Sequence, residues 1–296
     1  MHEHVVESRV PSGGVELAVR EVSAVSADAA TVVLVHGFPD TQAVWEPLVR
    51  LLHDRHGLSV VTYDVRGAGA STAPPDRAGY RTERLVDDVV AVLDAVRPGG
   101  RPAHLVGHDW GSVQLWDAVI AADSDPRLRG RIASFTSIAG PSLDHTAQFA
   151  RRSDPRARLS QALHSWYVAA FHVPVLPELA FRHLAGPLGA QISRGKGSGS
   201  GHVASTFGED AAHGLELYRA NLRRRMRSPG IGRTDVPVLT IVPTRDPFLT
   251  PALYDDHASY SARGRRVDVD AGHWVFLEQP ELVADLVVDW VREHAD

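Results

Sequence analysis

An aspartate stands where a serine is usual in one type of strand-to-helix turn. The segment HLVGHDWG, residues 104–111, joins an apolar strand to an amphipathic helix, with a glycine two positions before and two positions after Asp109. This pattern is typical of a nucleophile elbow, whose usual sequence is Gly-x-Ser-x-Gly. The alternative is that Asp109 only caps the following helix, which is a common role for aspartate.

A carboxylate at this position predicts attack on saturated carbon. The ordinary pKa of an aspartate is about 4, so Asp109 is ionised at neutral pH. A serine must lose a proton as it attacks and needs a base beside it from the start. Attack by a carboxylate on an acyl group would give an anhydride, whereas displacement at an sp3 carbon gives an alkyl ester. The expected substrates therefore contain an epoxide or a carbon–halogen bond.

Two further residues complete a catalytic set in the chain order nucleophile, acid, histidine. His273 directly follows the last predicted strand, in the segment DAGHW at residues 270–274. Asp246 follows the preceding strand and is the acid that we expect to orient His273, with Asp144 as the competing acid. His273 would then deprotonate a water molecule that attacks the ester carbonyl on Asp109.

Hydrolysis of that ester passes through an oxyanion, which needs hydrogen-bond donors. The backbone N–H of Trp110 lies at a helix N-terminus, where such donors point outward. A second donor is expected from the loop after the third strand, which has the sequence HGFP at residues 36–39. We assign this donor to the backbone N–H of Phe38.

The elements that position these residues follow from hydrophobic patterning. Short β-branched runs alternate with helical patterns, which predicts a mostly parallel eight-stranded sheet flanked by helices, with the first two strands forming an antiparallel hairpin. The predicted strands are Val5–Val10, Val15–Val22, Thr31–His36, Leu58–Tyr63, Ala103–Val106, Arg131–Ile138, Val238–Val242 and Arg265–Asp270. The predicted helices are Thr41–His53, Thr82–Val96, Trp110–Ala122, Pro251–Ser261 and Pro280–His294.

The alternation of strands and helices stops after Ile138 and resumes at Val238. Residues 142–231 read as helices, loops and prolines without a convincing strand. We interpret them as a helical cap inserted between two parts of one α/β core, residues 1–141 and 232–296. Within the cap, the tract Gly195–Gly201 is rich in glycine and serine and is predicted to be a mobile loop.

Composition excludes several classes of protein. The formal net charge is -5, without the basic surplus of a nucleic-acid binder. The chain has 0 cysteines, so it has no disulfide or thiolate metal site, which fits the cytoplasm. No apolar run reaches the length of a membrane span or a signal peptide. A His-Glu-x-x-His metal motif is also missing, and we expect neither a metal nor an organic cofactor.

The motifs together resemble those of the α/β-hydrolase-fold epoxide hydrolases. The resemblance rests on HGFP at residues 36–39, DVRGAGAS at 64–71, GHDWG at 107–111 and GHW at 272–274, and it covers essentially the whole chain. The chain is most similar to bacterial hydrolases that are sometimes fused to a short-chain dehydrogenase. No such second domain follows Asp296, so we interpret the sequence as the hydrolase part alone.

The resemblance further implies two cap tyrosines that hold and protonate the epoxide oxygen. The predicted cap contains only two tyrosines, Tyr167 and Tyr218, in the segments SWY and LYRAN. Phenols suit this task because they donate hydrogen bonds without ionising at neutral pH. The expected substrate-binding residues are Pro39, Trp110, Trp166 and Trp274.

Two other functions stay open at this stage. A haloalkane dehalogenase would share Asp-Trp at the elbow, although such enzymes often carry asparagine where this chain has Phe38. A non-catalytic ligand-binding member of the fold is the third interpretation, and an intact Asp109–Asp246–His273 set argues against it. We expect a small apolar epoxide as substrate and no nucleic-acid partner. The oligomeric state is not readable from the sequence, and a homodimer stays open.

Overall fold

The computed structural model describes residues 4–26, 28–99, 101–195 and 203–295. Eight strands form one sheet, as the sequence predicts, and each lies within a few residues of its predicted position. The strands are β1 (His4–Ser12), β2 (Val15–Ser23), β3 (Thr31–Val35), β4 (Ser59–Tyr63), β5 (Ala103–His108), β6 (Ile132–Ile138), β7 (Val238–Pro243) and β8 (Gly264–Val269).

The strand order in the sheet is β1-β2-β4-β3-β5-β6-β7-β8. β1 pairs antiparallel with β2, and β2 pairs antiparallel with β4. Every later pairing is parallel, from β4 with β3 through to β7 with β8. Because parallel strands share one direction, the loops that follow β3, β5, β7 and β8 all emerge at the same edge.

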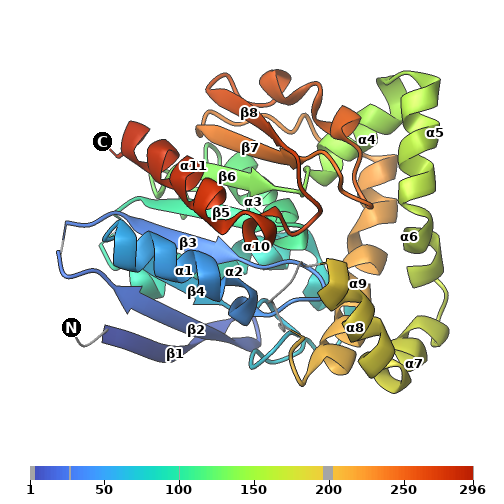
Figure 1. Cartoon of the computed structure of the whole chain (residues 1–296), viewed down its shortest axis with the longest axis horizontal. Helices are drawn as coiled ribbons and strands as arrows, with labels where there is room; N and C mark the ends of the chain where they lie inside the picture. Colours follow the sequence, from blue (N-terminus) through green and yellow to red (C-terminus); the bar gives the residue numbers. More distant parts are fainter. Residues whose placement is uncertain (1–3, 27, 100, 196–202, 296) are drawn as a thin grey trace.

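Helices cover both faces of the sheet (Figure 1). α2 and α3 pack on one face, and α1 and α11 pack on the other, each with its own apolar core. The central strands β3, β5 and β7 are buried along their whole length, as expected for strands covered on both faces. The core helices are α1 (Glu46–Arg50), α2 (Thr82–Val96), α3 (Trp110–Ala121), α10 (Val275–Glu278) and α11 (Pro280–Glu293).

Among the described residues, six helices lie between β6 and β7 and stand beyond the edge at which the loops after β3, β5, β7 and β8 emerge (Figure 1). They correspond to the segment that we interpret as a cap, and its boundaries at residues 142 and 231 stay a prediction. The helices are α4 (Leu143–Arg152), α5 (Pro155–His164), α6 (Trp166–Phe171), α7 (Leu176–His183), α8 (Ala185–Gly195) and α9 (Phe207–Arg227). The predicted mobile tract Gly195–Gly201 lies almost entirely outside the described residues.

Two predicted helices differ in the structure. The segment Pro251–Ser261 forms two short 3-10 turns, Pro251–Tyr254 and His257–Ser259. Its Asp and Ser residues are poor helix formers, because their side chains compete for backbone hydrogen bonds. The helix predicted at Thr41–His53 starts as a 3-10 turn at Gln42–Trp45, continues as α1, and ends in a π turn at Leu51–Arg55.

Candidate active site

Asp109 lies on a strained turn between β5 and α3. Its backbone has φ 52° and ψ -124°, a region that non-glycine residues rarely occupy. Glycines on either side are required by close backbone approach. A Cβ on Gly107 would lie 2.7 Å from the backbone of Ser112, and one on Gly111 would lie 2.1 Å from the Val35 carbonyl oxygen. The turn projects the Asp109 side chain beyond the edge of the sheet, as a nucleophile elbow does.

The Asp109 carboxylate does not cap helix α3. Its Oδ1 accepts a hydrogen bond from the backbone N–H of Phe38 at 2.7 Å, and the backbone N–H of Trp110 also hydrogen-bonds to the carboxylate. Burial raises the pKa of Asp109 from 3.8 to about 6, against the stabilising effect of His273 and of these two N–H groups. The carboxylate is therefore poorly solvated and carries negative charge at neutral pH.

His273 lies between Asp109 and Asp246. Its Nδ1 is 2.7 Å from Asp246 Oδ2, and its Nε2 is 3.7 Å from Asp109 Oδ2. Because Asp246 is an acceptor, the neutral imidazole carries its proton on Nδ1, and Nε2 faces Asp109. Burial would lower the pKa of His273, but the neighbouring Asp246 and Asp109 outweigh it and raise that pKa above 6.5.

Asp246 rather than Asp144 is the partner of His273. The other oxygen of Asp246, Oδ1, accepts backbone N–H groups of Phe248 at 2.7 Å and Leu249 at 3.2 Å, which fixes the carboxylate. Asp144 instead pairs with Arg225 at 3.0 Å and accepts the N–H of Gly230 at 2.9 Å. The competing acid thus joins the start of α4 to the end of α9 and does not contact His273.

A cavity of about 510 Å³ opens onto Asp109 and His273. Both tyrosines and the expected pocket residues Pro39, Trp166 and Trp274 line it, although Trp166 is 71% exposed and lies at the rim. Most of the wall is apolar. The other residues that line the cavity are Phe38, His164, Phe171, Phe181, Leu188, Gln191, Ile192, Pro247 and Phe248.

Trp110 does not contribute its side chain to this wall. Its indole packs edge-on against the ring of Tyr218 at 4.9 Å between centroids and is buried behind it. Of the four expected substrate-binding residues, Trp110 is thus the one that does not line the cavity, and its contact with substrate stays a prediction. Its backbone N–H still reaches the Asp109 carboxylate.

Tyr167 comes from α6 and Tyr218 from α9, so two separate helices bring the phenols together. Their ring centroids are 6.3 Å apart. Burial, followed by the charge of Asp109, raises the pKa of Tyr167, and burial also raises that of Tyr218. Both phenols therefore keep their protons far above neutral pH and can donate hydrogen bonds into the cavity.

Sequence reasoning missed two residues that support this site. Asp40 accepts a hydrogen bond from the indole Nε1 of Trp274 at 2.8 Å, which ties the loop after β3 to the loop after β8. His108, next to the nucleophile, is 3.1 Å from the carbonyl oxygen of His273 through Nε2 and packs on its ring at 4.6 Å. Asp40 follows the HGFP segment and His108 precedes Asp109. In the sequence, only these positions indicated that the two residues lie near the site.

The described residues contain no group of three or more His, Cys, Asp or Glu side chains that could hold a metal ion. Within the same part of the chain, none of the helices has the length and apolar character needed to cross a bilayer. The polar side chains that line the cavity include the carboxylate of Asp109, the imidazoles of His273 and His164, the two phenols and the amide of Gln191.

Comparison with known proteins agrees with this geometry. A family described as having the alpha/beta hydrolase fold matches residues 30–280. The chain belongs to this family. Epoxide hydrolase A of Mycobacterium tuberculosis is 30% identical over 327 residues, which cover 96% of this chain and 97% of that protein. The resemblance to epoxide hydrolases that the sequence motifs indicate is therefore confirmed.

A second relative is longer than this α/β-hydrolase-fold chain. The probable oxidoreductase EphD of Mycobacterium tuberculosis is 37% identical over 286 residues, which cover 89% of this chain and 46% of that protein. The chain thus spans about half the length of this curated relative.

Solved structures share the fold. Epoxide hydrolase A from Mycobacterium thermoresistibile superposes with a TM-score of 0.77 at 23% identity, covering 97% of this chain and 98% of that one. An epoxide hydrolase from Bacillus megaterium gives a TM-score of 0.79 at 18% identity, covering 96% and 100%. At these identities the likeness establishes the α/β-hydrolase fold, with its mostly parallel eight-stranded sheet.

Proposed function

We propose that this protein is an epoxide hydrolase that converts an apolar epoxide to a vicinal diol through an alkyl ester on Asp109. The pair of phenols that shares a cavity with Asp109 and His273 carries the proposal. An epoxide has no good leaving group until its oxygen accepts a hydrogen bond, and Tyr167 and Tyr218 are positioned to donate it. The relative named Epoxide hydrolase A supports the same reaction.

In the first step, Oδ2 of Asp109 attacks an epoxide carbon and the carbon–oxygen bond of the ring breaks. The epoxide oxygen takes a proton from one of the two tyrosines. Oδ1 stays in the oxyanion hole, since it accepts the N–H of Phe38 at 2.7 Å. That arrangement leaves Oδ2, on the side of His273, as the attacking atom.

In the second step, Nε2 of His273 removes a proton from water, and the resulting hydroxide attacks the ester carbonyl carbon of Asp109. Negative charge develops on Oδ1, where the N–H groups of Phe38 and Trp110 stabilise it. The intermediate collapses with departure of the diol, whose second hydroxyl takes the proton from His273. The proton left on Asp109 returns to the tyrosinate, so the reaction consumes one epoxide and one water.

A haloalkane dehalogenase would form the same ester but needs N–H donors for the departing halide. The indole N–H of Trp274 already donates to Asp40, and the indole of Trp110 lies behind Tyr218. The side chain of Phe38 has no donor. These contacts favour epoxide opening. The intact Asp109–His273–Asp246 arrangement favours an enzyme over a non-catalytic binding protein.

Substitution of the nucleophile tests the proposal. The purified protein should hydrolyse apolar epoxides to diols, and Asp109→Ala should reduce the rate by at least about 10⁴-fold, as expected when a covalent step is removed. A single turnover in H₂¹⁸O should place the label in Asp109 rather than in the diol. An Asp109→Ala variant with undiminished epoxide turnover, or label found first in the diol, would contradict the mechanism.

A further inference from the structure

We infer that His36 is a positioning residue that fixes the orientation of the oxyanion-hole donor. This inference rests on the proposed ester hydrolysis at Asp109. His36 is the first residue of the loop that supplies the N–H of Phe38 and is fully buried. Its role follows from the atoms that its two ring nitrogens contact.

Both ring nitrogens of His36 have hydrogen-bond partners. Nε2 accepts the backbone N–H of Val65 at 3.0 Å, so it carries no proton. The proton therefore sits on Nδ1, which lies 3.0 Å from the carbonyl oxygen of Gly37 and donates to it. The Val65 bond thus selects the one tautomer of His36 that can hold the Gly37 carbonyl.

The Gly37 carbonyl and the Phe38 N–H belong to one peptide unit. In a planar trans peptide these two groups point in opposite directions. When His36 holds the carbonyl on one side, the N–H is directed to the other side, where Asp109 Oδ1 accepts it at 2.7 Å. The imidazole therefore acts on Asp109 through the peptide plane rather than by contact.

The identity of residue 37 as glycine explains why its carbonyl group needs the hydrogen bond from His36. A Cβ at this position would lie 2.4 Å from the Cβ of Asp109, so only glycine allows the loop to approach the nucleophile. Glycine also has the greatest backbone freedom, and its following peptide can rotate away. His36 shares the task with the backbone N–H of Asp40, which donates to the same Gly37 carbonyl at 2.9 Å.

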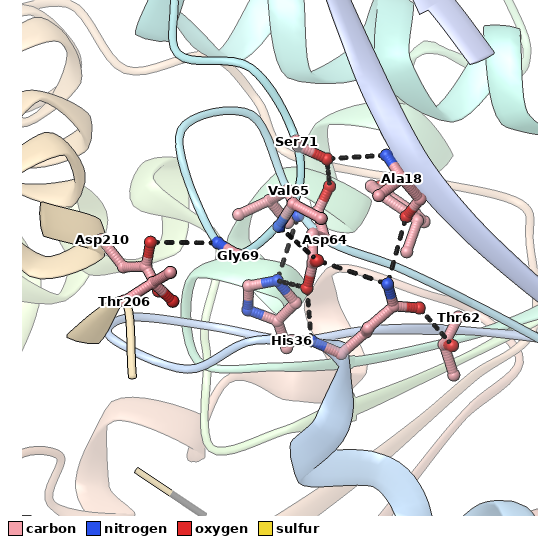
Figure 2. A network of polar contacts seen from close by, with 12 residues as sticks. Ala18, His36, Thr62, Asp64, Val65, Gly69, Ser71, Thr206 and Asp210 are labelled. Atoms are coloured by element: carbon pink, nitrogen blue, oxygen red, sulfur yellow. Dashed lines mark hydrogen bonds and ion pairs between the residues drawn. The ribbon is translucent and has the colours of Figure 1, made fainter. Parts of the chain in front are cut away.

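Val65, which donates to His36, is held in place by a polar network around the preceding residue, Asp64 (Figure 2). Asp64, which precedes Val65, accepts the backbone N–H groups of Gln42 and Ala70, each at 2.8 Å. Its own carbonyl oxygen accepts the hydroxyl of Ser71 at 2.5 Å. These bonds join the loop after β3 to the loop after β4, so the Val65 N–H is presented to His36 from a rigid support.

Two substitutions separate the two hydrogen bonds of His36. Asn places an amide N–H near the position of Nδ1 and can still donate to Gly37. Gln reaches the position of Nε2 and can still accept from Val65, but it loses the donor to Gly37. A matched control is His104→Gln, because His104 is equally buried but contacts Ser134 in the sheet, at 2.8 Å, rather than the oxyanion loop.

The readout is the rate of each half-reaction in single-turnover experiments. His36→Gln should slow ester hydrolysis about 10-fold, less than the 10²–10³ for losing a donor outright, since Asp40 still holds Gly37. Formation of the ester should change little, so the ester accumulates. His36→Asn should recover most of the hydrolysis rate. A role in packing alone would slow both half-reactions equally in both variants, and that result would overturn the inference.

A measurement on the unsubstituted protein is independent of folding of the variants and of catalysis. An N–H···N hydrogen bond transmits a ¹⁵N–¹⁵N coupling, so the amide of Val65 should couple to an unprotonated histidine ring nitrogen. A proton on Nε2 of His36, without that coupling, would overturn the inference. If the coupling is present but no epoxide is hydrolysed, the proposed function fails while the placement of the Phe38 peptide stands.

Discussion

Asp109 combines a strained backbone with a poorly solvated carboxylate. Its φ of 52° aims the side chain out of the sheet, and burial raises its pKa to about 6. One oxygen is held by the N–H of Phe38, while the other faces His273. In the proposed mechanism the two oxygens therefore have separate tasks, since one attacks carbon and the other later carries the oxyanion charge.

The titrations of Asp109 and His273 predict that activity is lost on the acid side. Ester formation needs the carboxylate, so its rate should fall as pH drops below about 6. Hydrolysis needs neutral His273, and its rate should fall as pH drops through the pKa of His273, which the neighbouring Asp246 raises. Stopped-flow measurement of the rate of each half-reaction against pH tests both expectations. If the rate of ester formation falls only near pH 4, Asp109 is well solvated and the prediction is wrong.

The two tyrosines should act in ester formation and not in hydrolysis. Tyr167→Phe or Tyr218→Phe alone should slow ring opening by about 10- to 100-fold, because one phenol remains to donate. The double variant should lose a further factor of at least about 100. Because burial raises the pKa of both phenols, no basic limb is expected up to the ordinary tyrosine pKa of 10. Equal slowing of both half-reactions would argue against proton donation.

At the scale of elements, the site depends on how α9 is seated on the core. Asp210, in the first turn of α9, accepts the backbone N–H of Gly69 at 3.0 Å and the hydroxyl of Thr206 at 2.6 Å (Figure 2). One turn further along, a Cβ on Gly214 would lie 2.5 Å from the ring of Phe38. Helix α9, which carries Tyr218, is thus hydrogen-bonded to the loop after β4 and packed against Phe38 in the loop after β3.

Removing the hydrogen bond between Asp210 and Gly69 should weaken the attachment of α9 to the core. Asp210→Ala leaves the half-buried N–H of Gly69 without its acceptor, which should destabilise the protein by about 1–3 kcal/mol and speed amide exchange at Gly69. The control is Glu209→Gln, in the same turn, which breaks only an exposed pair with Arg182 and should change stability by less than about 1 kcal/mol. Thermal unfolding and hydrogen exchange measure both, and equal effects of the two substitutions would refute this role of Asp210.

At the scale of the whole molecule, the site is assembled from parts that are far apart in the chain. The loops after β3, β5, β7 and β8 carry Phe38, Asp109, Asp246 and His273. α6 and α9 add Tyr167 and Tyr218 to the same cavity. In the proposed mechanism, the core provides the ester chemistry and the inserted helices activate the leaving group.

The strained turn at Asp109, the place of His273 after a strand and the sheet could be predicted, because each follows from a local sequence pattern. Glycines around Asp109 and the strand before it identify the turn, and His273 follows a strand end. The tautomer of His36 could not be predicted, since it depends on Val65, 29 positions away in the sequence. The choice of Asp246 over Asp144 and the place of Trp110 behind Tyr218 likewise required tertiary structure.

The most direct test of the central claim is the intact mass of the His273→Gln variant after incubation with apolar epoxides, and separately with haloalkanes. Without its base the enzyme should form the ester and fail to hydrolyse it, so the mass should rise by that of one whole epoxide, mapped by peptide analysis to Asp109. A gain of an alkyl group without its halogen, from the haloalkanes alone, would reassign the enzyme as a dehalogenase. No adduct on Asp109 with either class would contradict the covalent mechanism.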